Sequence, residues 1–163
     1  MTFPISHSPA EEAAEQVSRN HPVVRLKPKA EARAIRHGFP WVYADELVTD
    51  RRTQGLAPGA LAILQDGERR DLGLVTVNTN SKIIARMLDR NPEAVIDQSW
   101  FEARLSRALD LRARLYAQPF YRLVHAESDG LPGIVIDRFG DVAVVQPNAA
   151  WADARISDLV AAL

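Results

Sequence analysis

The chain has 163 residues, of which 47% are hydrophobic and 25% are charged, so it can form one ordinary globular domain or two small ones. It contains no run of about 18 apolar residues, which excludes a membrane-spanning helix, and its first residues lack the basic start and apolar core of a secretion signal. The absence of cysteine excludes disulfides and thiolate metal ligands, and it fits a cytoplasmic protein.

The net charge of -1 hides an uneven distribution. Residues 21–90 carry 12 basic and eight acidic side chains, whereas the segments on either side are acidic overall. A basic middle part indicates where a polyanion would bind, although such an excess is also typical of an ordinary solvated surface.

The first half of the chain predicts a flexible tail followed by a small β-barrel. The tail covers residues 1–21, with a short helix at 10–17, and the first strand follows at 23–26. A helix is predicted at 29–37, ended by a glycine and a proline. Further short strands separated by turns favour a barrel over a parallel sheet; they are predicted at 60–64, 72–77 and 82–88.

The helix predicted at 29–37 has a basic face. At 100° per residue, Lys29, Arg33 and Arg36 fall within about 60° of each other. His37 lies beside this stripe and Trp41 follows the helix, which gives cations and an aromatic ring suited to phosphates and an exposed base. The alternative is a solvated helix face with Trp41 in the core.

Two further basic residues fall on one strand. Lys82 and Arg86 are four residues apart and share a face of the strand predicted at 82–88. They either extend the basic surface or are two solvent-facing charges on an edge strand.

A long helix is predicted in the second half of the chain. It begins at Ser99, with Glu102 completing a capping box, and it ends before Pro119. Arg112 falls on the apolar face of this helix. We interpret it as a side chain that reaches solvent from the rim, with burial against a carboxylate at 127 or 129 as the alternative.

Residues 121–146 predict a polar strand, a tight turn and a hairpin. Asp129-Gly130 is a strong turn dipeptide, and the β-branched runs at 134–136 and 142–145 predict a hairpin over 133–146. One amphipathic helix is predicted after it, at 151–163.

His125, Glu127 and Asp129 alternate along the chain. On a strand all three would face the same way, and a His-x-Glu-x-Asp pattern can bind a metal ion. We favour a wet strand face without metal, because Asp129 is better used by the Asp-Gly turn.

Two groups of motifs resemble a known family. Tyr121-Arg122, the run ESDGLPG at 127–133 and the run DRFG at 137–140 resemble the central region of RlmI-type bacterial 23S rRNA methyltransferases, which methylate cytosine at carbon 5. The run GFPWVY at 38–43 resembles their amino-terminal PUA domain, a small RNA-binding β-barrel.

This resemblance implies an α+β fold in two domains. A PUA-like barrel with an inserted helix would occupy 22–79, and a strand-strand-helix-strand-strand central domain would occupy 80–163, with the boundary anywhere between 71 and 95. The segment 121–133 would face the cleft between the central and catalytic domains. Its candidates for contacting substrate are Arg122, Glu127 and Asp129. The alternative is structural, with Arg122 paired with Glu127 across the polar face of the strand.

The resemblance also implies a function in RNA recognition. The expected partner is structured RNA, namely 23S rRNA, with neither DNA nor membrane. The expected RNA-binding residues are Lys29, Arg33, Arg36, His37, Trp41, Lys82 and Arg86.

No catalytic residue or metal site is expected in this chain. It has no Gly-rich strand-to-helix loop and no cysteine nucleophile, so we expect it to bind no S-adenosylmethionine and to be inactive alone, as a fragment of a longer methyltransferase that uses this cofactor. The alternatives are a free-standing PUA-type RNA-binding module and a protein-interaction domain without RNA.

Overall fold

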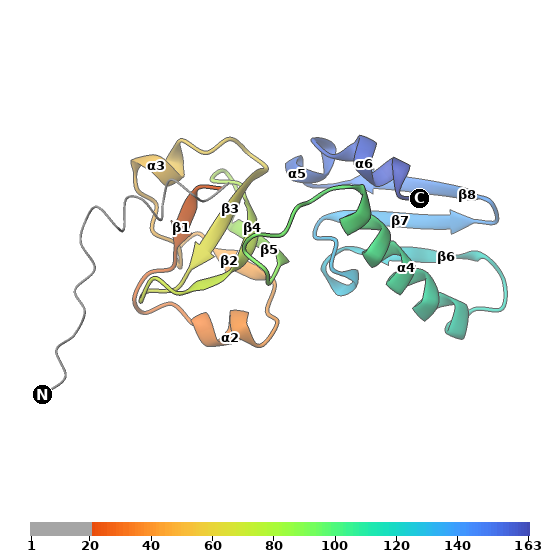
Figure 1. Ribbon diagram of the computed structural model, residues 1–163, viewed down its shortest axis with the longest axis horizontal. Coiled ribbons are helices and arrows are strands. Elements are labelled where there is room, and N and C mark those ends of the chain that lie inside the picture. Colours follow the sequence, from red (N-terminus) through yellow and green to blue (C-terminus); the bar gives the residue numbers. More distant parts are fainter. Residues whose placement is uncertain (1–20) are drawn as a thin grey trace, which may run out of the picture.

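The computed structural model describes residues 21–163, so nearly all of the predicted tail, including its short helix, lies outside the described residues. Figure 1 shows two lobes side by side, one built around a curled sheet and the other around a sheet covered by helices. Within the described residues, no helix is long and apolar enough to cross a membrane.

The first lobe is a five-stranded sheet with the order β1-β3-β4-β5-β2. Its elements are β1 (Val23–Arg25), α2 (Ala32–Arg36), β2 (Trp41–Tyr43), α3 (Arg51–Gln54), β3 (Ala60–Gln65), β4 (Asp71–Val77) and β5 (Ile83–Asp89). The end of β1 meets the segment after β2, because Leu26 bridges to Leu47 and the Val48 amide donates to the Arg25 carbonyl at 2.8 Å. These bonds curl the sheet into a half-barrel, which confirms the predicted fold class.

The second lobe is a three-stranded antiparallel sheet with helices on one face. Its elements are α4 (Gln98–Leu115), β6 (Phe120–His125), the 3-10 helix η1 (Ala126–Asp129), β7 (Ile134–Phe139), β8 (Val142–Pro147), α5 (Ala150–Asp153) and α6 (Ile156–Ala161). The predicted hairpin is present as β7 and β8, which turn at Gly140. Phe101 of α4 stacks on Trp151 of α5 in the core beneath the sheet, with ring centroids 6.1 Å apart.

The sheet topology corrects the predicted central domain. The strands predicted at 72–77 and 82–88 exist as β4 and β5, but both belong to the first sheet. Strand β5 pairs with β4 on one side and with β2 on the other, where Arg86 lies opposite Trp41. The nominal division between residues 79 and 80 therefore falls inside the β4–β5 hairpin; the change of sheet comes after Asp89, within the range of 71–95 given for the boundary.

Two predicted helices begin at different residues in the structure. Helix α2 begins at Ala32, because residues 27–30 form a turn that the Ala30 amide closes by donating to the Lys27 carbonyl at 2.9 Å. The N-cap of α4 is Asp97, whose carboxylate accepts from the Trp100 amide at 2.9 Å, in place of the capping box predicted two residues later at Ser99.

The single helix predicted at 151–163 is broken. Arg155 leaves helical geometry between α5 and α6, with a φ of -125°. Its guanidinium donates to the Ile96 carbonyl at 2.7 Å, across to the segment that precedes α4. A contact with residues far away in the sequence therefore accompanies the break.

The lobes meet at a close backbone approach. Gly59, immediately before β3, has a φ of +87°, and a Cβ placed there would lie 2.6 Å from the backbone nitrogen of Trp151. Trp151 is buried and its indole N–H donates to the Pro132 carbonyl at 2.8 Å. Leu74 of β4 and Leu88 of β5 belong to the core of the second lobe, so the two lobes share an apolar seam.

Candidate nucleic-acid interface

Three aromatic side chains line the edge strand of the half-barrel. Phe39, Trp41 and Tyr43 alternate along the chain, and Phe39 lies 5.9 Å from Trp41 and 6.5 Å from Tyr43 between ring centroids. Phe39 is 41% exposed and Tyr43 is 38% exposed, so these two rings are accessible. We call these three residues the aromatic platform.

Lys82 supplies a positive charge beside the platform. Its carbonyl accepts from the Ala44 amide at 3.0 Å, and its side chain lines an open hollow together with Tyr43 and two acidic residues, Asp45 and Glu46. Lys82 is exposed and pairs with no carboxylate among residues 21–163.

The predicted basic stripe of the first helix is smaller than its sequence suggests. Lys29 lies in the turn before α2, which removes it from the helical face. Arg36 donates to Asp66, a buried carboxylate that also accepts from the Arg70 side chain at 2.9 Å. In the described part of the chain, Lys29 and Arg33 have no carboxylate partner, whereas Arg36 is neutralised.

Asp66 is held in its charged form. Burial would raise its pKa, but the backbone and side-chain hydrogen bonds from Arg70 and the backbone hydrogen bond from Glu68 lower the pKa below its ordinary value. His37, the other candidate on this helix, is exposed, and its Nδ1–H donates to the Arg33 carbonyl at 2.8 Å.

Trp41 and Arg86 both contact Glu127 of the second lobe. The Trp41 indole donates to Glu127 Oε1 at 2.9 Å, and Arg86 Nη1 donates to the same oxygen at 2.5 Å. Burial raises the pKa of Glu127, but the Trp41 hydrogen bond and the Arg86 charge outweigh burial and lower it. These three residues connect the two lobes. Arg86 is therefore not a free cation, because its charge is paired with Glu127.

Asp129 is held by a buried ion pair. Arg112 of α4 donates to both of its carboxylate oxygens, at 2.6 and 2.7 Å, and the His125 amide donates to it at 2.6 Å. The Arg112 and Asp129 side chains are only 11% and 6% exposed. Arg112 therefore does not reach solvent from the rim; the alternative of burial against a carboxylate is the one that the structure has.

The predicted cluster of Arg122, Glu127 and Asp129 is not formed. Arg122 pairs with Asp137, directly opposite on β7, at 2.9 and 3.1 Å, while Glu127 and Asp129 have the separate partners given above. The His125 pattern also fails as a metal site, because His125 ends β6 while the two carboxylates lie in η1. No group of three metal-binding side chains occurs among the described residues.

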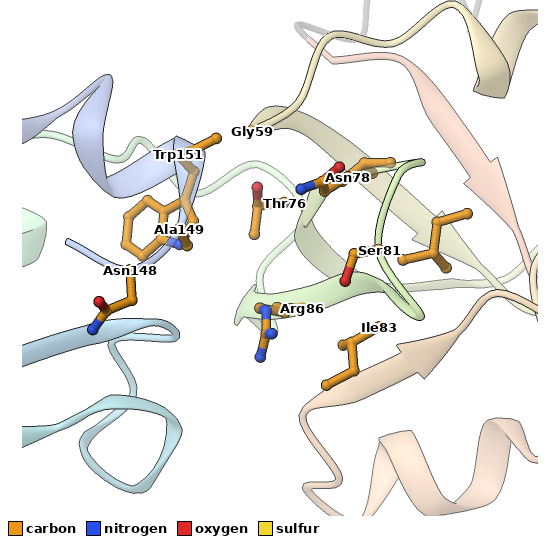
Figure 2. A pocket seen from close by; sticks show the side chains of 12 residues that line it. Gly59, Thr76, Asn78, Ser81, Ile83, Arg86, Asn148, Ala149 and Trp151 are labelled. Carbon is orange, nitrogen blue, oxygen red and sulfur yellow. The ribbon is translucent and has the colours of Figure 1, made fainter.

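A small polar pocket lies between the lobes. Figure 2 shows Asn148 and Trp151 of the second lobe on one side and Thr76, Ser81 and Arg86 of the first on the other. Its volume is about 120 Å³, well below the roughly 300–1,000 Å³ of sites for drug-sized ligands and cofactors. It is therefore too small for a ligand of that size.

Comparisons with known proteins find relatives that match both lobes. Residues 24–90 match a PUA-like domain, from within β1 to one residue after β5. A ribosomal RNA large subunit methyltransferase of Deinococcus radiodurans is 36% identical over 139 residues, covering 80% of this chain and 34% of the relative. The chain is a homologue of the RlmI-type ribosomal RNA large subunit methyltransferases.

A second curated relative matches to a similar extent. Ribosomal RNA large subunit methyltransferase I of Pseudoalteromonas translucida is 33% identical over 134 residues, which cover 80% of this chain and 33% of that protein. The chain thus spans about a third of the length of the curated relatives it matches. The solved structure of a Streptococcus mutans protein classed as a SAM-dependent methyltransferase shares the fold, with a TM-score of 0.72, 16% identity, and coverage of 86% of this chain and 36% of that one.

Sequence reasoning missed two residues of the platform. Phe39 and Tyr43 lie within the GFPWVY motif, but only Trp41 was predicted to meet RNA. The missed signal was the alternation of three aromatic residues, which places them on one face if the segment is a strand.

Proposed function

We propose that this chain is the RNA-recognition portion of a SAM-dependent ribosomal RNA large-subunit methyltransferase. It would position rRNA for base methylation by a catalytic domain of the longer protein, which would use S-adenosylmethionine. The names of the curated relatives and the PUA-like domain support this proposal. The observation that carries it is the exposed aromatic platform beside Lys82.

The platform has the chemistry that unpaired RNA bases require. Sequence-specific RNA recognition targets loops and ends whose bases stack on aromatic rings, and each stacked base contributes about 1–3 kcal/mol. Phe39 and Tyr43 supply the two accessible rings. Trp41 packs edge-on against Phe39 and is fixed by Glu127, so it supports the platform from behind.

Three unpaired cations lie on the same lobe as the platform. Lys29, Arg33 and Lys82 pair with no carboxylate among the described residues and can take RNA phosphates. Arg36 and Arg86 instead form ion pairs within the protein, with Asp66 and Glu127 respectively, and these pairs stabilise the surface around the platform. We therefore assign RNA contact to the first three and a supporting role to the other two.

The test is RNA binding by the 163-residue chain. Fluorescence anisotropy with a labelled RNA hairpin that has an unpaired loop would compare the wild-type chain with the Phe39→Ala/Tyr43→Ala variant. We expect the variant to lose at least about tenfold in affinity, because two stacking surfaces are removed. Phe139→Ala is the matched control, since Phe139 is a similarly exposed ring on the second lobe. Equal losses in both variants, or no binding by the wild-type chain, would contradict the proposal.

A further inference from the structure

Helix α4 carries two arginines without a structural partner. Its four arginines are Arg104, Arg107, Arg112 and Arg114. Arg104 is half-buried: it donates to Asp89 at 2.8 Å and lies over the Trp100 ring at 3.4 Å from the centroid. Arg112 is buried against Asp129, as described above. Arg107 and Arg114 are exposed and pair with no carboxylate in the part of the chain that the structure describes.

These two arginines share one face of the helix. Arg107, Leu111 and Arg114 are spaced four and three residues apart, which places them on one stripe. Arg107 and Arg114 are therefore separated by about 10 Å along the helix axis. That distance lets each guanidinium bind a different phosphate of one nucleic-acid strand.

The stripe forms a wall of a groove. A hollow of about 410 Å³ lies between α4 and the turn at the end of η1, and its lining includes Arg107, Arg114, Ser128 and Gly130. We call it the arginine groove. Asp110 also lines it, but without an ion pair to either arginine, so the free charges in the groove are two positive and one negative.

The groove adjoins the aromatic platform through η1. Glu127 accepts the hydrogen bond from Trp41 of the platform, and the next residues, Ser128 to Gly130, line the groove. The same short segment thus contacts the platform at one end and borders the arginine groove at the other.

We propose that the arginine groove is a second RNA-binding site, in which Arg107 and Arg114 bind phosphates of the strand whose bases meet the platform. This inference rests on the proposed function, since it takes RNA as the ligand. Guanidinium groups suit the task because their planar donors bind phosphate oxygens bidentately and remain charged at any physiological pH.

Salt-dependent binding tests the groove. The Arg107→Ala/Arg114→Ala variant of the 163-residue chain would be titrated with the same labelled RNA hairpin at several salt concentrations. Each phosphate contact adds about 0.7–0.9 to the slope of log K against log salt, so we expect the slope to fall by about 1.4–1.8. The matched control is Arg51→Ala/Arg52→Ala on α3, which removes the same charge from two exposed arginines of the first lobe, far from α4 (Figure 1).

The outcomes separate this inference from the proposed function. A smaller slope in the α4 variant alone, with an unchanged melting temperature, supports the groove. An unchanged slope in the α4 variant, while the platform variant still loses binding, overturns the groove and leaves the proposed function standing. Equal changes in the α4 and α3 variants indicate a net-charge effect and overturn the groove, and a wild-type chain that binds no RNA overturns both.

Discussion

Replacing Asp129 by alanine should destabilise the protein strongly. The change removes the two carboxylate oxygens that accept from Arg112, one of which also accepts from the His125 amide. It leaves the Arg112 charge in a site where that side chain is only 11% exposed. The hydrogen bond from Arg112 Nε to the Arg122 carbonyl at 3.1 Å remains, but a neutral carbonyl does not balance the charge. Breaking a buried pair in this way costs about 3–5 kcal/mol.

That cost predicts a large thermal shift. For a chain of this size each kcal/mol lowers the melting temperature by about 2–4 °C, so the expected fall is about 6–20 °C. The matched control is Asp137→Ala, which breaks the more exposed pair with Arg122 and should cost less than about 1 kcal/mol.

Thermal and urea unfolding followed by circular dichroism would measure both variants. RNA binding would be measured in parallel at a temperature where each variant is folded. A fall of less than about 2 °C in Asp129→Ala, together with a loss of RNA affinity, would refute the structural role and return Asp129 to the candidates for contacting substrate.

Two further predictions concern the contact between the lobes. Glu127→Gln should lower the free energy of unfolding by about 1–3 kcal/mol near pH 7, because it removes the charge that Arg86 balances. The folded-state pKa of Glu127 is below its ordinary value of 4.5, so the difference in stability between the variant and the wild-type chain should shrink as the pH falls below that value. A difference that stays constant in urea titrations from pH 7 to about 3.5 would contradict this prediction. Gly59→Ala should lower the free energy of unfolding by about 2–5 kcal/mol in urea titrations, because residue 59 has a positive φ and the new Cβ would clash with Trp151. Gly140→Ala is the control: residue 140 also has a positive φ but lies in open space, so its loss should be about 1–2 kcal/mol. Similar losses in the two variants would show that the close approach at Gly59 is unimportant.

Local sequence patterns predicted most of the strands correctly. The β-branched runs and the turn at Gly140 specify β7 and β8 without help from the rest of the chain, because the alternation and the turn agree. Strand β2 was missed because it has three residues and pairs with β5, whose partner residues lie 40 to 45 positions further along the chain. The break at Arg155 was missed for the same reason, since its partner Ile96 is 59 residues away.

The candidate site was less predictable than the fold. Sequence located the motif that holds the aromatic platform, but it could not say which charges are free. Arg36 is paired with a carboxylate 30 residues away, and Arg86 with one 41 residues away. Propensity and periodicity report on neighbours within a few residues, so they cannot reveal such pairs.

The apolar seam between the lobes has a consequence for how this protein could be inherited and dissected. Strand β4 sends Val75 and Val77 into the half-barrel and Leu74 into the other core, and Leu88 of β5 also belongs to that second core. A cut after Asp89 would interrupt no strand, but it would expose the Leu74 and Leu88 side chains to solvent, because the core that covers them belongs to the other lobe. The PUA-like lobe of this chain is therefore not an independent domain that can be exchanged by itself. Recombination or truncation after Asp89 would give two fragments that expose apolar surface and tend to aggregate, so functional exchanges should carry both lobes together.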